Sequence, residues 1–370
     1  LFSDIIPATM SEDAEAQVLS LLSKANYATS SSSPSIVIHS SQEMGYTGAA
    51  VFDVTVDMSR LFIKHVVLKP GPKLVRDKKS YVCDAYCLAN LRDVNVPKLH
   101  ASYAQGDVVI SIMASLNDTH STSPPTGMEY GEVLKDLITT LAKLHAGRGK
   151  GLDPNTDKLW SIGGHVYNPS TYALSTISSS FGAFCAAFAG TSDTLSKALE
   201  GGYPDKLQAA APEVIEELKT RTPHFVHGDA KLANFLFESE GYSGPSSVAV
   251  LDFQWSGWGV GASDLVYLLS TCLTEELLPR VEELKTAYFA AVSALDSEYT
   301  RARFDRDWHL ALLDYVRWVF SYRYGLTNPQ TPEMFEERRR RDDPNTGRFQ
   351  KSVKVVEWLV EGAMAELDLR

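Results

Sequence analysis

The stretch that decides the fold reads His227-Gly228-Asp229-Ala230-Lys231-Leu232-Ala233-Asn234. A second stretch, Leu251-Asp252-Phe253-Gln254, follows it at the end of an apolar run. Asp229 supplies a carboxylate that can accept a proton from a hydroxyl group. Asn234 and Asp252 supply the hard oxygen ligands that Mg²⁺ prefers. Together these are the side chains that phosphoryl transfer requires.

A predicted hairpin brings the two stretches together. The segment NFLFE begins at Asn234, the segment SVAVLDF ends just after Asp252, and a turn rich in Gly, Ser and Pro lies between them. We therefore expect the side chains of Asp229, Asn234 and Asp252 to meet at one edge of a sheet. A turn with capping residues at its ends would explain any one of these residues, but not the set.

The pattern HGDxxxxN followed by DFQ resembles the signature of the aminoglycoside phosphotransferase and choline kinase superfamily. The DFQ form, with Asp264-Leu265-Val266-Tyr267 after it, is most similar to the ecdysteroid-kinase-like, or CHK kinase-like, branch. The resemblance covers nearly the whole chain and implies a bilobal protein-kinase-like fold. It also implies that Asp229 is the catalytic base and that Asn234 and Asp252 bind magnesium.

Three further residues have predicted supporting roles around this loop. The resemblance implies that His227 holds the loop and that Asp264 ties it from the start of a helix, where a simple N-cap is the alternative. Protein kinases show the same Asp-x-Lys-x-x-Asn spacing, with the lysine at the transferring phosphoryl group. A cation at Lys231 can neutralise charge on the γ-phosphate, and a surface lysine is the alternative.

The first part of the chain is expected to bind the nucleotide. The resemblance implies that Lys69, at the end of the third predicted strand, reaches the α- and β-phosphates. A lysine buried among apolar neighbours is costly unless it is paired. Gly45 and Gly48 would let a turn approach the phosphates, and backbone groups near Met113 and Ser115 would contact the adenine.

The resemblance also requires an acid on the next helix to pair with Lys69. The family usually has Glu there, whereas the segment DKKSYVCDAYCLANL offers Asp77 and Asp84, seven residues apart on one helix face. Asp84 fits the apolar pattern better, although its side chain is shorter by a methylene. We predict that Asp84 pairs with Lys69; a solvated helix acid is the alternative.

The order of patterns along the chain predicts an α+β fold. Residues 36–69 contain three segments rich in β-branched and aromatic residues, which predict an antiparallel sheet. Helical periodicity dominates from residue 129 onward. The polar stretch over residues 117–127 suits a connection. We therefore predict an N-terminal nucleotide-binding lobe over residues 1–116 and a C-terminal catalytic and substrate-binding lobe over residues 117–370.

Composition restricts the classes of partner. Of 370 residues, 35 are Lys or Arg and 46 are Asp or Glu, which gives a formal charge of -11 and argues against nucleic-acid binding. The most apolar stretch, residues 181–190, is far shorter than the roughly 20 residues that span a membrane. The four cysteines show no disulfide or zinc pattern, which favours reduced thiols in the cytoplasm.

These observations predict an ATP- and Mg²⁺-dependent phosphotransferase that acts on a hydroxyl group of a small molecule. Only 11 residues separate Asp252 from Asp264, too few for the activation and peptide-binding segment of a protein kinase. A nucleotide-binding pseudokinase that serves as a scaffold or sensor is the alternative. It is motivated by Asp in place of Glu on the helix and by the incomplete glycine turn.

The accepting alcohol stays open at this stage. Aromatic and acidic residues of the helix predicted over 305–324 are candidate substrate contacts: Asp314, Tyr315, Trp318 and Tyr322. Such aromatics can hold a protonated or quaternary amine through cation–π contacts, or they can simply pack a core. Trp255 and Trp258 could instead line an apolar pocket for a sterol or another hydrophobic alcohol. The oligomeric state is not indicated by the sequence.

Overall fold

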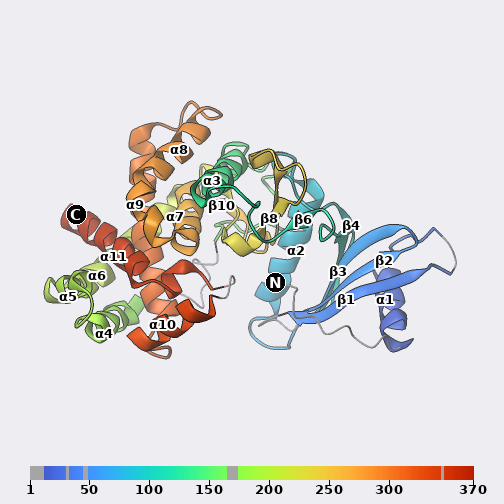
Figure 1. Cartoon of the computed structure of the whole chain (residues 1–370), viewed down its shortest axis with the longest axis horizontal. Helices are drawn as coiled ribbons and strands as arrows, with labels where there is room; N and C mark the ends of the chain where they lie inside the picture. The colour runs from blue at the N-terminus through green and yellow to red at the C-terminus, as the bar shows by residue number, and fades with distance from the viewer. Residues whose placement is uncertain (1–11, 31–32, 45–48, 165–173, 343–345) are drawn as a thin grey trace. The chain divides into compact units, whose positions relative to one another are not determined.

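The computed structural model describes residues 12–30, 33–44, 49–164, 174–342 and 346–370 (Figure 1). Gly45 and Gly48 therefore lie outside the described residues. The chain forms two compact units. The first comprises residues 1–125, 151–159 and 236–254, and the second comprises residues 126–150, 160–235 and 255–370. The assignment of nucleotide binding to residues 1–116 and of catalysis and substrate binding to residues 117–370 stays a prediction.

The first unit is built on a five-stranded sheet with strand order β1-β2-β3-β5-β4, and each neighbouring pair is antiparallel. Its strands are β1 (Ile36–Met44), β2 (Ala49–Val56), β3 (Ser59–Val67), β4 (Leu99–Gln105) and β5 (Val108–Ala114). Two helices belong to the same unit, α1 (Glu12–Lys24) and α2 (Leu74–Asn90).

The two faces of this sheet pack against different helices. Val18 of α1 shares a core with Ile63 of β3, whereas Tyr81 of α2 shares a second core with Val66 of β3. Side chains alternate between the two faces along a strand. Lys64, which directly follows Ile63, therefore lies on the face that α2 covers.

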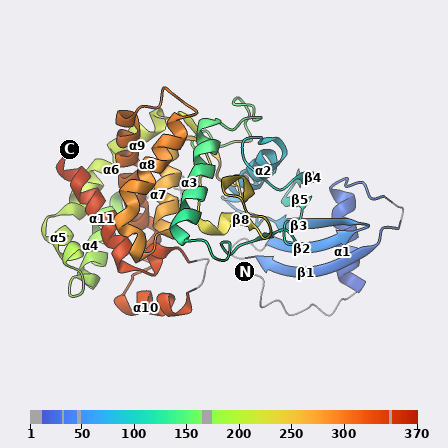
Figure 2. The ribbon, with the colours of Figure 1, turned by 45° about the horizontal axis from the view of Figure 1, so that its top comes forward.

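The second unit is mainly helical, and Figures 1 and 2 show α3, α7, α8 and α9 side by side. Its helices are α3 (Tyr130–Ala146), α4 (Ile177–Phe188), α5 (Asp193–Glu200), α6 (Tyr203–Thr220), α7 (Gly261–Cys272), α8 (Val281–Ser293), α9 (Arg301–Trp318), α10 (Pro332–Arg341) and α11 (Val353–Asp368). Helix α3 packs against α8, and α9 packs against α6, α7 and α11.

Two small sheets contain the strands that flank the predicted catalytic loop in the sequence. Strand β7 (His224–Val226) pairs with β10 (Gly257–Gly259) in an antiparallel ladder. A second small sheet has the order β6 (His120–Ser121), β8 (Phe235–Glu238) and β9 (Val248–Val250). Asn234 directly precedes β8 and Asp252 follows two residues after β9, as the hairpin prediction requires along the chain.

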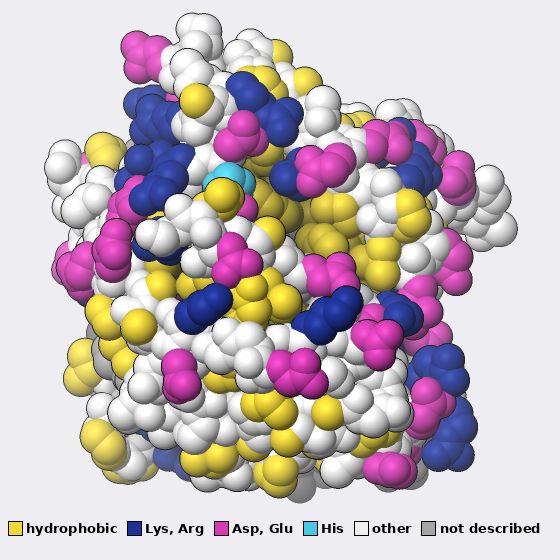
Figure 3. Space-filling model, turned by 90° about the vertical axis from the view of Figure 1, so that its left-hand side faces the viewer, with side chains coloured by type: hydrophobic (Ala, Val, Ile, Leu, Met, Phe, Trp, Pro, Cys, Tyr) yellow, Lys and Arg dark blue, Asp and Glu magenta, His cyan; other side chains and the backbone are white. Residues whose placement is uncertain are grey.

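The structure confirms an α+β fold with an antiparallel sheet in the first part of the chain and a larger helical part after it. None of the helices in the described part of the chain is long and apolar enough to cross a bilayer. On the face shown in Figure 3, acidic and basic side chains are interspersed, and hydrophobic side chains form the floor of a central hollow. The formal charge of -11 is therefore not concentrated in one acidic patch on this face.

Candidate active site

The loop after β7 places three of the predicted side chains in direct contact. Asp229 Oδ2 accepts a hydrogen bond from Lys231 Nζ at 2.6 Å and another from Asn234 Nδ2 at 3.1 Å. Asn234 Nδ2 also donates to the backbone carbonyl of Asp229 at 2.8 Å. Asp229 is nearly buried, with 8% of its surface exposed. The loop therefore holds a carboxylate beside a cation and an amide.

Asp264, in the first turn of α7, holds the backbone of this loop. Its carboxylate accepts the N–H groups of His227 at 2.6 Å and Gly228 at 2.9 Å. His145 of α3 lies 3.0 Å from the same carboxylate. Burial would raise the pKa of Asp264, but the hydrogen bonds from His145 and Gly228 outweigh it and lower that pKa. Asp264 thus stays ionised and binds two backbone N–H groups.

Gly228 is required by the path of the loop. Its φ angle is +82°, a left-handed conformation that glycine adopts without steric cost. A Cβ atom there would lie 2.3 Å from the backbone oxygen of Trp255. Beside it, the ring Nδ1 of His227 accepts the N–H of Asp229 at 3.2 Å. His227 therefore contacts the loop as a structural residue would, through the backbone.

We predict that the buried histidine His224 makes the folded protein less stable in acid. Burial, followed by the effect of His145, lowers the pKa of His224 to about 2. The unfolded chain therefore binds a proton below about pH 6.5 that the folded chain does not, so the free energy of unfolding falls as the pH falls. His224→Asn should keep an acceptor for the N–H of Gly261. Denaturant titrations at about pH 7 and pH 5 should show that the wild type loses about 2 kcal/mol more than this variant. Equal losses of unfolding free energy in the wild type and the variant would contradict the lowered pKa of His224.

The first unit carries a lysine between two carboxylates. Lys64 Nζ of β3 lies 3.8 Å from Asp84 Oδ2 and 3.9 Å from Asp252 Oδ1. It also lies 5.0 Å from the centre of the Tyr81 ring. Burial lowers the pKa of Lys64, but Asp252 and then Asp84 raise it, and the net shift is upward. Lys64 is therefore a charged, largely buried lysine.

The prediction that Lys69 is buried at the end of the third strand is wrong. Strand β3 ends at Val67, and Lys69 is exposed. The physical reason is that side chains alternate between the two faces along β3, and this alternation places Lys64 on the face that α2 covers. The lysine that contacts Asp84 is therefore Lys64, five residues earlier.

Helix α2 also fixes the segment that contains Asp252. Asp84 Oδ1 accepts the N–H of Phe253 at 2.9 Å, and the thiol of Cys83 donates to the Phe253 carbonyl at 3.2 Å. Asp252 itself has φ +63°, a strained conformation for a residue other than glycine. Its Oδ1 is buried and accepts no hydrogen bond from the described residues. Such an unsatisfied carboxylate oxygen fits a metal ligand.

The predicted adenine-binding segment lies at the end of β5. The side chain of Met113 is buried in the sheet, with 8% of its surface exposed. The N–H of Ser115 donates to the carbonyl of Arg60 at 3.1 Å, so this backbone donor is already engaged. A role of these residues in adenine binding stays a prediction.

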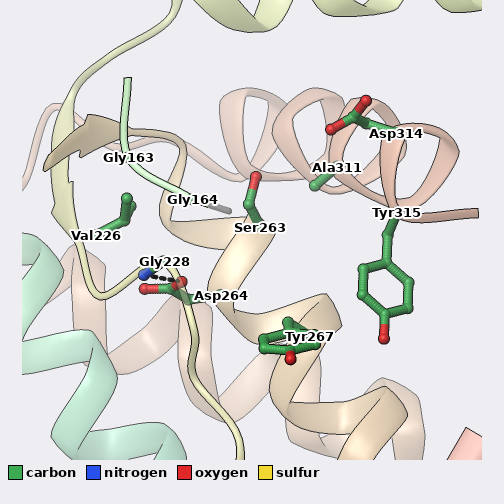
Figure 4. A pocket seen from close by; sticks show the side chains of 10 residues that line it. All are labelled: Gly163, Gly164, Val226, Gly228, Ser263, Asp264, Tyr267, Ala311, Asp314 and Tyr315. Atoms are coloured by element: carbon green, nitrogen blue, oxygen red, sulfur yellow. Dashed lines mark hydrogen bonds between the residues drawn. The ribbon is translucent and has the colours of Figure 1, made fainter. Parts of the chain in front are cut away.

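A hollow in the second unit adjoins the predicted catalytic loop at Gly228 (Figure 4). It is lined by Gly163, Gly164, Val226, Gly228, Ser263, Asp264, Tyr267, Ala311, Asp314 and Tyr315. Asp314 accepts a hydrogen bond from Nε of the fully buried Arg317 at 2.6 Å. The two carboxylates of the hollow are thus both bound to donors, and most of the remaining lining carries no charge.

The predicted substrate contacts divide into two groups. Asp314 and Tyr315 line the hollow. Trp255 stacks on Trp160 with ring centres 5.3 Å apart, and Trp258 packs edge-on against Phe225. Neither tryptophan lines the hollow, and neither do the two remaining candidates. Trp318 is buried in the helical core, and Tyr322 is 51% exposed.

Sequence reasoning missed two residues of the site, Lys64 and Tyr267. Lys64 follows Ile63 and lies two residues before Val66, so strand alternation places it on the same face as Val66. Once α2 is known to cover that face, the contact of Lys64 with α2 follows. Tyr267 was noticed only as part of the Asp264-Leu265-Val266-Tyr267 motif. The structure shows that its hydroxyl donates a hydrogen bond to Asp229.

Comparison with known proteins gives the class of the chain. Residues 84–304, more than half of its length, match the model of the phosphotransferase enzyme family (APH). The chain therefore belongs to this family. None of the curated proteins that were searched matches it.

Solved structures with a similar fold include a microcompartment-associated aminopropanol kinase, at 15% identity and a TM-score of 0.49, covering 95% of this chain and 97% of that one. A spectinomycin phosphotransferase in complex with ADP and spectinomycin matches at 13% identity and a TM-score of 0.46, covering 95% and 98%. An aminoglycoside-3'-phosphotransferase of type VIII matches at 16% identity and a TM-score of 0.40, covering 82% and 98%.

Proposed function

We propose that this protein transfers the γ-phosphoryl group of ATP to a hydroxyl group of a small molecule, with Mg²⁺ as the cofactor. The observation that carries the proposal is the carboxylate of Asp229, which lies 2.6 Å from Lys231 Nζ on a loop whose backbone is tied to Asp264. A carboxylate beside a cation suits the deprotonation of a hydroxyl group next to a transferring phosphoryl group. Family membership supports the same reaction class.

The residues of the loop have distinct roles in this proposal. Asp229 orients the acceptor hydroxyl and takes its proton as the new oxygen–phosphorus bond forms and the bond between the γ-phosphorus and the departing ADP breaks. Lys231 turns from Asp229 toward the phosphoryl oxygens and offsets their charge. Asp264 keeps the loop backbone fixed, so the base does not have to be reordered when the substrate binds.

Asn234 and Asp252 would hold the metal ion. Asn234 uses its amide nitrogen to donate to Asp229, which leaves its amide oxygen as a ligand. Asp252 offers the buried oxygen that lacks a hydrogen bond within the described residues. Among the described residues, no group of three or more His, Cys, Asp or Glu is placed to hold a metal. Bound Mg²⁺ would neutralise charge on the phosphates.

Lys64 is the lysine that we propose for the nucleotide phosphates. It is held by Asp84 and Asp252 at distances of 3.8 and 3.9 Å. Asp in place of Glu on α2 therefore does not remove the ion pair, which weakens the case for a pseudokinase. The expected cytoplasmic location and lack of nucleic-acid binding stay predictions.

We further propose that the acceptor is a neutral alcohol. Asp314 is paired with the buried Arg317, and Asp264 is bound by His145 and backbone N–H groups. Among the described residues that line the hollow, no carboxylate is left uncompensated to select a protonated amine. The DFQ and DLVY motifs resemble the ecdysteroid-kinase-like branch, and this resemblance favours the same kind of acceptor.

The test is ADP release from ATP with a panel of neutral alcohols and a matched panel of amino alcohols, each with and without Mg²⁺. We expect Mg²⁺-dependent turnover that is faster with the neutral panel, and mass spectrometry should find one phosphoryl group added to the product. Faster turnover with amino alcohols would contradict the neutral acceptor. Nucleotide binding without turnover across both panels would favour the pseudokinase.

A further inference from the structure

Tyr267 lies on α7, three residues after Asp264, and its ring lines the hollow (Figure 4). We propose that Tyr267 is a positioning residue that fixes the carboxylate of Asp229 for attack by the acceptor hydroxyl. This inference rests on the proposed function, since it assigns a role to a residue beside the proposed base.

The contact itself is a hydrogen bond from the Tyr267 hydroxyl to the Asp229 carboxylate. Burial, followed by the negative charge of Asp229, raises the pKa of Tyr267 well above its usual value. The hydroxyl therefore keeps its proton at neutral pH and acts only as a donor to the carboxylate. A neutral donor to a carboxylate forms one of the stronger classes of hydrogen bond.

One helix thereby holds both the backbone and the side chain of the catalytic loop. Residues three apart on a helix lie on the same face. Asp264 binds the backbone N–H groups of His227 and Gly228, and Tyr267 binds the side chain of Asp229. A site supported by a rigid helix keeps its geometry better than a loop alone.

Lys231 and Asn234 also donate to Asp229 but have different partners in the proposed reaction. Lys231 turns to the phosphoryl oxygens, and Asn234 belongs to the predicted magnesium site. Tyr267 has its ring packed 5.6 Å from Tyr315 and edge-on to Trp318, with centres 6.1 Å apart. This packing limits the rotamers of the ring, so Tyr267 can keep Asp229 in place while Lys231 moves.

The test compares Tyr267→Phe with Tyr324→Phe. The first removes only the hydroxyl at Asp229 and keeps the ring. The second removes a buried hydroxyl that donates to the Phe349 carbonyl at 2.8 Å, in the aromatic core of the helical unit. Steady-state hydrolysis of Mg·ATP, with water as the acceptor, gives kcat and KM, and a thermal melt gives Tm. Assays run well below the Tm of each variant separate folding from turnover.

We expect Tyr267→Phe to lower kcat about tenfold or more while the KM for ATP stays unchanged, because misplacement of a base lowers the rate without weakening nucleotide binding. Tyr324→Phe should keep the wild-type kcat even if its Tm falls. An unchanged kcat in Tyr267→Phe, or a similar loss of kcat in both variants, would overturn the positioning role. The same series includes Asp229→Asn. If this variant hydrolysed ATP at the wild-type rate, the proposed function would be overturned. If it were inactive while Tyr267→Phe stayed fully active, only the positioning role would be overturned.

Discussion

Replacing Asp229 with Asn is expected to lower phosphoryl transfer, measured as ADP release, by about 10²- to 10⁴-fold. Asn has nearly the same shape but cannot accept the proton of the acceptor hydroxyl. The fold should persist because Lys231, which would lose its charged partner, has 34% of its side chain exposed and can be solvated. ATP affinity, measured by thermal-shift titration with Mg²⁺, should change little.

A matched control is Asp157→Asn, which removes an exposed carboxylate that belongs to neither of the two motifs. This variant should release ADP at the wild-type rate. If Asp229→Asn also retained the wild-type rate, Asp229 would not be the base. If it lost ATP binding together with turnover, Asp229 would serve the nucleotide site or the fold rather than the acceptor hydroxyl.

The parts of the site that depend on local spacing were predictable from the sequence. Asp229, Lys231 and Asn234 lie within six residues, so one short loop brings them together whatever surrounds it. The contact of Asp264 with the loop also follows from a motif read in order along the chain. The antiparallel sheet followed by helices was predictable because period-2 and period-3.6 patterns occupy separate parts of the chain.

The parts that depend on packing between distant elements were not predictable in the same way. Which face of β3 meets α2 determines whether Lys64 or Lys69 contacts Asp84, and strand alternation alone does not indicate which helix covers which face. Tyr267 required a different kind of information, since its contact with Asp229 joins α7 to a loop 38 residues earlier in the chain. The left-handed conformation of Asp252 likewise occurs next to a long-range contact, since Asp84 of α2 binds the N–H of Phe253.

Replacing Lys64 with Met is the second change with a large expected effect. It removes the positive charge between Asp84 and Asp252 while keeping an unbranched side chain on the α2 face of the sheet. We expect ADP release to fall by about 10²-fold or more, because the nucleotide phosphates lose their charged partner. The free energy of unfolding should also fall by about 3 kcal/mol, since the buried carboxylate of Asp84 is left uncompensated.

The two effects of Lys64→Met can be separated by Asp84→Asn and by Lys69→Met. Adding Asp84→Asn to Lys64→Met removes the uncompensated carboxylate, so the double variant should regain part of the lost stability in denaturant titrations without regaining turnover. Lys69→Met, at an exposed position after β3, should keep both stability and ATP turnover. If Lys69→Met instead lost ATP turnover while Lys64→Met retained it, the nucleotide lysine would be Lys69, and the ion pair of Lys64 with Asp84 would serve the fold alone.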